Sequence, residues 1–201
     1  RGTPNSFVNG RGIQGAQPLA VFKALIVEEL AKAKALTEEG ILPADLYAHI
    51  IKKGKQFPDL GDKEHDFVMK DAPIQGDWTH APMKITVFSD FQCPYCSKVA
   101  PILEAVRDRL GWKVALSFKH FPLSFHELAK PAAKATICAQ RQGKFWSYHD
   151  AIFESQESWV PSVFTDTAAT LGLDMNSFKA CLKDDAALTQ IIERDMKEGE
   201  E

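Results

Sequence analysis

The segment MKITVFSDFQCPYCSKVAP, residues 83–101, constrains the fold more than any other part of the sequence. Its β-branched and aromatic start predicts a buried strand over 83–90. The turn that holds Cys93 and Cys96 then opens a predicted helix, which runs to about Leu110 and ends at Gly111. Residues 112–119 predict a second strand. A strand, a helix and a strand within this length predict a βαβ unit with a parallel pair of strands and a right-handed crossover.

The two cysteines of this turn allow three interpretations: half of a metal site, a redox pair, or two buried packing thiols. Zinc would need two further ligands, and the sequence offers neither a second C-x-x-C nor an H-x-x-x-H pair. No metal is therefore expected. Thiol exchange explains the helix start, because free N–H groups and the helix dipole stabilise a thiolate at Cys93. We expect Cys93 to be the exposed, attacking sulfur and Cys96, one turn inside the helix, the resolving one.

Composition limits the other function classes. The 201 residues have a formal net charge of −3, which gives no broad attraction to nucleic acid. No apolar run approaches the roughly 18 residues of a membrane span. The four cysteines are too few for a disulfide scaffold in a chain of this length. The first residue is not Met, which indicates a trimmed or processed chain.

The remaining elements are predicted from turn and helix signals. Asn9-Gly10 predicts a β-hairpin, and Gln17-Pro18 opens a helix that extends to about Leu36. A short helix is expected over 43–53, and a short strand over 66–69. Asp174 is expected to be an N-cap. Further helices are expected over 128–142, 144–155, 164–171 and 174–182 and around Leu188–Met196.

The motif and its surroundings resemble the DsbA-type thiol-disulfide oxidoreductases, which are thioredoxin-superfamily proteins with a helical insertion. The resemblance rests on DAPIQGDWTHAPMKITVFSDFQCPYC, KHFPLSFHELAKPAA, QGKFWSYHDAIF and LGLDMNSFKACL, and it covers nearly everything from Asp71 to Glu201. It implies an α/β, thioredoxin-like fold with an inserted helical subdomain.

The order of the segments departs from that family. In that family, the last helix of the insertion leads into a Gly-Thr-Pro turn with a cis proline, which is followed by a hairpin and a closing helix. In this chain the corresponding segments stand at the beginning of the sequence, from Gly2-Thr3-Pro4 onward. The resemblance thus implies a permuted order: the C-terminal part of a thioredoxin-like unit, a linker with a short helix, the N-terminal βαβ part with CPYC, and the helical insertion. These segments are 1–36, 37–65, 66–120 and 121–201.

Two explanations of this order stay open, a piece of a tandem-repeat protein and a true circular permutant. Without residues 1–36 the sheet would expose an edge and a hydrophobic face. We therefore expect these residues to dock, either within the chain or exchanged between the two chains of a domain-swapped dimer.

The resemblance also assigns roles. Pro94 and Tyr95 shape the active site, and Thr3-Pro4 is implied to lie against the disulfide and to pair with an extended substrate. From the residues themselves, independently of the resemblance, Asp90 is either a proton acceptor or a capping or solvated carboxylate. His120 and His126 have packing or surface roles or lie near the active-site groove. Cys138 and Cys181 form a structural disulfide or remain isolated thiols.

The predicted function is DsbA-type thiol-disulfide exchange with extended or unfolded protein substrates, without a bound cofactor or nucleic acid. The compartment is expected to be the periplasm or otherwise extracytoplasmic, where a membrane redox partner would suit the chemistry. A low Cys93 pKa would move the redox potential towards about −120 mV rather than about −270 mV. The alternatives are a non-catalytic peptide-binding module and a disulfide isomerase or glutathione-linked reductase.

Overall fold

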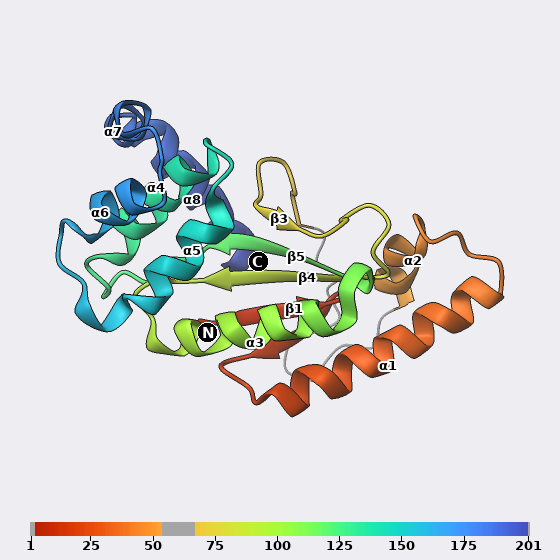
Figure 1. Cartoon of the computed structure of the whole chain (residues 1–201). Helices are drawn as coiled ribbons and strands as arrows, with labels where there is room; N and C mark the ends of the chain where they lie inside the picture. Colours follow the sequence, from red (N-terminus) through yellow and green to blue (C-terminus); the bar gives the residue numbers. More distant parts are fainter. Residues whose placement is uncertain (1–2, 54–66, 201) are drawn as a thin grey trace. The chain divides into compact units, whose positions relative to one another are not determined.

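The computed structural model describes residues 3–53 and 67–200 (Figure 1). The chain divides into two compact units. Unit 1 consists of Arg1–Val87 and Pro101–Phe118, and unit 2 of Phe88–Ala100 and Lys119–Glu201. These boundaries differ from the four segments above, whose organisation stays a prediction. Three elements contribute to both units: β4 (Met83–Ser89), α3 (Pro94–Leu110) and β5 (Val114–His120).

Unit 1 begins with the predicted hairpin, which is confirmed as β1 (Asn5–Val8) paired antiparallel with β2 (Arg11–Gln14). Asn9 and Gly10 connect the strands with φ values of 49° and 79°. Two residues with positive φ make the tight turn that matches the strand twist, and Asn-Gly adopts it most readily. A side chain at Gly10 would be strained by this φ, and its Cβ would also approach Ile51 Cγ2 at 3.3 Å.

The strands form one five-stranded sheet in the order β2-β1-β4-β5-β3 (Figure 1). The backbone N–H of Asn9, in the turn of the hairpin, donates to the Lys84 carbonyl of β4 at 3.2 Å. Strand β1 thus lies beside β4 within this one chain. Exchange of residues 1–36 between two chains stays a prediction.

The predicted βαβ unit is confirmed. Its strands β4 and β5 are neighbours in the sheet, and α3 connects them. Ser117 Oγ donates to Thr86 Oγ1, and three residues further along β4 the Phe121 N–H donates to the Ser89 carbonyl. Later residues of one strand therefore face later residues of the other, so β4 and β5 run parallel. Gly111, with φ 58°, ends α3 as expected.

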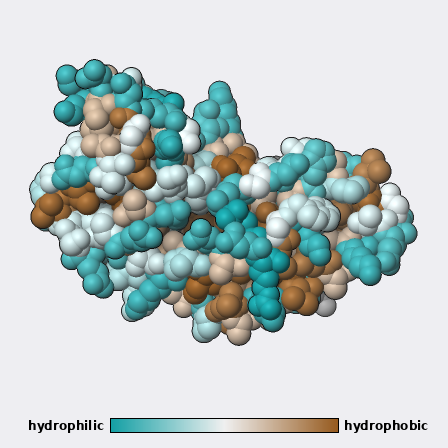
Figure 2. All heavy atoms as spheres, in the orientation of Figure 1, coloured by the Kyte–Doolittle hydropathy of each residue, from teal (hydrophilic) through white to brown (hydrophobic). Residues whose placement is uncertain are grey.

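Helix α1 (Leu19–Glu38) follows Pro18 and ends two residues later than expected. One buried position on it is charged: Glu29 is 0% exposed, and its Oε1 lies 2.7 Å from Arg11 Nη1 of β2. The short helix expected over 43–53 is confirmed as α2 (Leu46–Lys53), which begins three residues later than expected. Ala33 of α1 packs with Leu46 and Ile50 of α2. Hydrophobic surface lies over α1 in Figure 2. The exposed apolar residues of this helix include Leu19, Val21 and Val27.

The expected strand over 66–69 is wrong for Phe67, Val68 and Met69, which lie outside any strand; Asp66 is outside the described residues. Phe67 is buried by an edge contact with the Phe7 ring, centroids 5.2 Å apart, so burial here does not require strand pairing. The strand in this region is β3 (Ile74–Gln75), which pairs antiparallel with β5.

Unit 2 carries the helical insertion, and the predicted helices are confirmed within a few residues. Asp174 is the expected N-cap, because its Oδ1 accepts the Ser177 N–H at 2.6 Å. Tyr148 is fully buried and donates through its hydroxyl to the Phe164 carbonyl at 2.6 Å. The helices are α4 (Ala129–Gln140), α5 (Phe145–Glu154), α6 (Val163–Thr170), α7 (Met175–Lys183) and α8 (Asp185–Glu200).

Candidate active site

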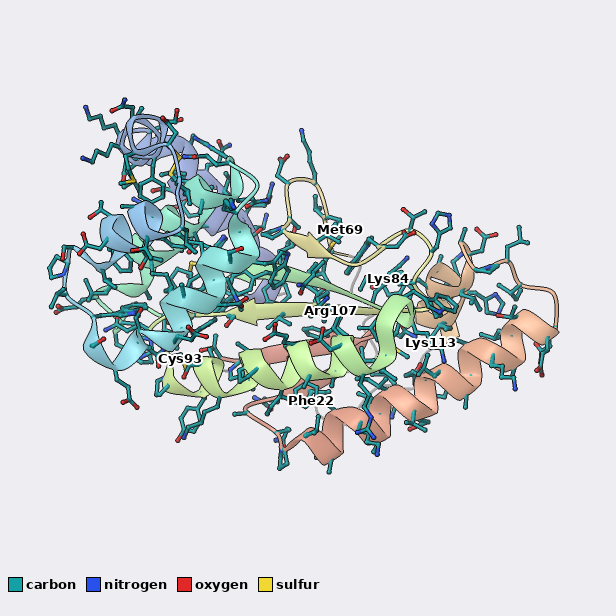
Figure 3. All side chains as sticks on the ribbon, viewed as in Figure 1. Phe22, Met69, Lys84, Cys93, Arg107 and Lys113 are labelled. Atoms are coloured by element: carbon teal, nitrogen blue, oxygen red, sulfur yellow. A yellow bond between two sulfur atoms is a disulfide. The ribbon has the colours of Figure 1, made fainter. Side chains whose placement is uncertain are left out.

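Cys93 lies immediately before α3, at the N-terminus of that helix (Figure 3). Its carbonyl accepts the N–H groups of Cys96 at 3.0 Å and Ser97 at 3.3 Å, which are the first backbone bonds of the helix. The Cys93 N–H donates to the Asp90 carbonyl at 3.1 Å. The side chain of Cys93 therefore projects from a helix N-terminus, where a thiolate is stabilised by the dipole and by free N–H groups.

Cys96 lies in the first turn of α3 and is 1% exposed. Burial raises the pKa of this thiol well above its usual range, and the hydrogen bond with Cys93 raises it further. The Ser89 side chain and the Asp90 N–H, 3.4 Å from the sulfur, act in the opposite direction and are outweighed. Cys96 is thus held as a protonated thiol at neutral pH, while Cys93 has the environment of a nucleophile.

The expectation that Cys93 is exposed is wrong in this structure, where the residue is 4% exposed. Gln156 contacts its backbone, since Nε2 of Gln156 donates to the Cys93 carbonyl at 3.0 Å. Pro94 and Tyr95 are the exposed residues of the motif, Tyr95 at 58%. An incoming group therefore meets Pro94 and Tyr95 before it reaches the Cys93 sulfur.

Asp90 has a fully buried carboxylate whose hydrogen bonds fix the approach to the motif. Oδ1 accepts the Gln92 N–H at 2.7 Å, and Oδ2 accepts the Leu123 N–H at 2.8 Å and contacts His126 Nδ1 at 2.7 Å. Of the interpretations left open, the structure supports a capping carboxylate that is not solvated. It also places His126 directly against the segment that precedes Cys93.

Two glutamines complete this arrangement, and sequence reasoning missed both roles. Gln92 accepts the Leu128 N–H through Oε1 at 2.7 Å. Gln156, in a short 3-10 helix (Gln156–Ser158), donates to the carbonyls of Phe91 at 2.7 Å and Cys93 at 3.0 Å. No local signal marks Gln156, because its partners are 65 and 63 residues away. The motif segment is thus tied to two parts of the insertion, the loop before α4 and the segment after α5.

His120 is buried in an aromatic cluster rather than in contact with solvent. Its ring lies 6.2 Å from the Phe91 ring and 6.2 Å from the Phe145 ring, centroid to centroid. Burial lowers the pKa of His120 to about 4 against the raising effect of Asp195, so the imidazole is neutral at pH 7. A packing role is therefore the one that the structure supports.

A cluster of buried charged side chains connects α8 to β5. Lys119 is 0% exposed, and its Nζ lies 3.3 Å from Asp195 Oδ1 and 2.9 Å from Glu198 Oε2. Asp195 also accepts the His120 N–H at 3.1 Å. A cation this deep requires paired carboxylates, and the sequence pattern did not indicate that α8 supplies them.

Thr3-Pro4 contains the cis peptide bond that the family resemblance implies. Pro4 is buried in unit 1, and its carbonyl accepts the Gly15 N–H at 2.9 Å. Gly2 of the same turn lies outside the described residues. The role of Thr3 and Pro4 against the disulfide stays a prediction.

The other two cysteines form a disulfide, one of the two alternatives above. Cys138 of α4 is bonded to Cys181 of α7, with the Cα atoms 5.8 Å apart and a sequence separation of 43. Over residues 3–53 and 67–200, no group of three or more metal-ligating side chains is present. In the same described ranges, no helix has the length and apolarity needed to cross a membrane.

Comparison with known proteins connects this geometry to a family. A family profile described as Thioredoxin matches residues 70–201. The structure resembles DsbA2 from Pseudomonas aeruginosa, with 28% identity, a TM-score of 0.52 and coverage of 62% of this chain and 69% of that one. It also resembles oxidised BdbD from Bacillus subtilis, with 24% identity, a TM-score of 0.58 and coverage of 68% and 78%.

The curated relatives are much longer proteins. A Na(+)/H(+) antiporter NhaA 3 from Salinispora tropica is 34% identical over 121 residues, which are 56% of this chain and 18% of the relative. An antiporter NhaA from Herminiimonas arsenicoxydans is 29% identical over 143 residues, or 68% of this chain and 22% of the relative. The chain thus spans about a fifth of the length of these relatives. With the family profile and the solved structures together, the chain belongs to the thioredoxin family, and its fold is that of the DsbA-type thiol-disulfide oxidoreductases.

Proposed function

We propose that the Cys93–Cys96 pair exchanges its disulfide with extended or unfolded protein substrates, in the manner of DsbA. The observation that carries this proposal is the contrast between two neighbouring sulfurs. Cys93 lies at the N-terminus of α3, while burial and the Cys93 thiol hold Cys96 protonated. Such a pair has one sulfur suited to attack and one suited to resolve a mixed disulfide.

The exchange then proceeds in two displacements. With the pair oxidised, a substrate thiolate attacks Cys93 Sγ, the Cys93–Cys96 bond breaks, and Cys96 leaves with the electron pair and takes up a proton. A second substrate thiolate attacks the substrate sulfur of the mixed disulfide, and Cys93 leaves as a thiolate. The substrate gains a disulfide, and its two electrons remain on the Cys93–Cys96 dithiol. Net oxidation of this kind requires an oxidising compartment such as the periplasm, with a membrane redox partner as the acceptor of the electrons.

The test equilibrates the chain with mixtures of reduced and oxidised glutathione and measures the Cys93–Cys96 state by mass after acid quenching. We expect a cooperative two-electron transition well above the thioredoxin potential of about −270 mV. In a second assay the oxidised chain is mixed with a reduced, unfolded protein, and disulfide transfer is followed by alkylation. A strongly reducing potential together with slow transfer would instead support a reductase.

The burial of Cys93 favours a second candidate, a non-catalytic binding module. A residue that is 4% exposed offers little surface to an incoming sulfur. Rapid alkylation of Cys93 at mildly acidic pH would support the enzyme. Alkylation that follows the ordinary thiol pKa of about 8.5 would support the module.

A further inference from the structure

The Cys138–Cys181 disulfide lies beside a pocket of unit 2 that the CPYC motif does not line. The pocket has a volume of about 460 Å³, and its two cysteines differ in accessibility. Cys138 is 0% exposed, whereas Cys181 is half-buried. A nucleophile from solvent therefore reaches the Cys181 sulfur first. The lining residues are Cys138, Arg141, Gln142, Ser177, Ala180 and Cys181.

Arg141 gives this pocket a positive charge at the reactive atom. Nη1 of Arg141 donates to Cys181 Sγ at 3.4 Å. Among the described residues that line the pocket, Arg141 is the only charged one. The nearby carboxylate of Asp184 is 3.9 Å from Nη1, and the two side chains are 42% and 54% exposed. A pair this exposed is weak, and a guanidinium has five N–H donors. Arg141 therefore remains able to bind an incoming anion.

We propose that Cys181 is a second thiol–disulfide exchange site, at which anionic low-molecular-weight thiols attack the Cys138–Cys181 disulfide. The small thiolate attacks Cys181 Sγ, the S–S bond breaks, and Cys138 Sγ leaves with the electron pair and takes a proton from water. Cys181 then carries a mixed disulfide. A second thiolate attacks the small-molecule sulfur and releases Cys181 as a thiolate next to the Arg141 guanidinium. Two electrons pass from two small thiols to the disulfide between α4 and α7.

The function of Arg141 in this step is electrostatic. A negatively charged thiol is attracted into the pocket, and the same cation stabilises the Cys181 thiolate that the second step releases. A neutral thiol lacks the first effect, and a positively charged thiol is repelled. The exchange rate at this site should therefore depend on the charge of the thiol, whereas reduction of an ordinary accessible disulfide should not. The proposal does not rest on the function of Cys93 and Cys96.

The experiment uses the full chain and three small thiols of similar size: 2-mercaptoethanesulfonate, 2-mercaptoethanol and cysteamine. Concentrations are set so that the thiolate concentration is equal in each reaction. Samples are quenched with acid, alkylated and mapped by peptide mass, which assigns adducts to each cysteine separately. The variants are Arg141→Gln, Arg141→Lys and, as a matched control, Arg109→Gln, an exposed arginine outside the pocket.

We expect adducts on Cys181 rather than Cys138, formed about two- to fivefold faster with the anionic thiol than with the cationic one. This preference should disappear in Arg141→Gln, persist in Arg141→Lys and Arg109→Gln, and fall as salt is added. Equal rates for the three thiols, adducts on Cys138, or no exchange below denaturing conditions would each overturn the proposal. Adducts on Cys93 or Cys96 are scored separately and report only on the CPYC site.

Discussion

The two cysteine pairs of unit 2 are held in opposite ways. Cys93 and Cys96 are three residues apart in one helical turn and are not joined by a disulfide, and hydrogen bonds to distant segments hold the chain around them. Cys138 and Cys181 come from two helices and are 43 residues apart, and their covalent bond joins those helices directly. The positions of the Cys93 and Cys96 sulfurs thus depend on the surrounding hydrogen bonds. The Cys138–Cys181 bond, by contrast, itself holds the two helices together. Substitutions at the two pairs should therefore affect different properties.

The largest difference is expected for Cys93→Ser. Removing the attacking sulfur should lower the rate of disulfide transfer to a reduced protein by more than about a thousandfold, because the Cys93–Cys96 disulfide that is transferred can no longer form. The free energy of unfolding should change little. Transfer is measured by alkylation and mass, and stability by urea unfolding. Full transfer activity in Cys93→Ser would show that the chemistry lies elsewhere.

The double variant Cys138→Ser/Cys181→Ser should show the opposite pattern. A disulfide that closes a loop of this length stabilises a folded protein by about 4 kcal/mol, chiefly by restricting the unfolded chain. We expect a loss of about that size in the free energy of unfolding, measured with denaturant under oxidising conditions. Transfer through Cys93 should continue at temperatures where the variant stays folded. An unchanged stability would mean that packing alone holds α4 against α7.

Acid should destabilise the aromatic cluster near Phe91. The folded-state pKa of His120 is about 4, below its ordinary value of 6.5, so the imidazole is neutral in the folded chain. Between these pH values the unfolded chain binds the extra proton, so stability falls as pH drops from 6.5 to 4. The fall is about 3 kcal/mol. The charged and titratable groups that act on His120 are Asp195, His149, Lys119 and Arg194.

This pH effect is measured by denaturant unfolding between pH 4 and 7. His120→Gln should flatten the dependence in that window. His80→Gln is the control, because the side chain of His80 is 67% exposed. A slope that survives in His120→Gln would assign the acid sensitivity to another group.

The smallest effect, and the sharpest comparison, concerns two glutamines. Gln156 donates to the carbonyls of Phe91 and Cys93, and Gln142 makes two hydrogen bonds to the backbone of Asp174. Gln156→Leu and Gln142→Leu should each cost about 1–2 kcal/mol of stability. Only Gln156→Leu should change the Cys93 alkylation rate, by about three- to tenfold. Equal alkylation rates in the two variants would show that Gln156 has no influence on the Cys93 thiol.

The features that the sequence predicted and those that it missed differ in the sequence separation between the interacting residues. Asn9-Gly10 and the Asp174 cap depend on residues one to three positions apart, so their patterns are visible without a fold. Gln156 and Lys119 act on partners 63 or more residues away, and nothing near them indicates those partners. Phe67 is an example of a local pattern that misled. The apolar run predicted a strand over 66–69, but Phe67 is buried by a ring contact with Phe7 instead.

The sequence therefore predicted the two cysteines of the candidate site, but not the residues that hold the backbone around them. Cys93 and Cys96 follow from spacing and a helix start, which are local features. The low exposure of Cys93 depends on how the insertion folds back over the motif, through Gln156 and the loop that carries His126. Such enclosure is a property of tertiary packing, and no pattern within the motif reports it.

The raised pKa of Cys96 has a consequence for the number of protons that accompany the electrons. Reduction of the pair adds two electrons, and Cys96 takes up a proton throughout the neutral range. Where Cys93 is the thiolate that its helix N-terminus favours, the couple consumes one proton rather than two. Its potential then falls by about 30 mV for each unit of pH, half the change of a couple that takes up two protons. The acidity of the surrounding compartment would therefore alter the oxidising strength of this pair only half as steeply as that of an ordinary dithiol.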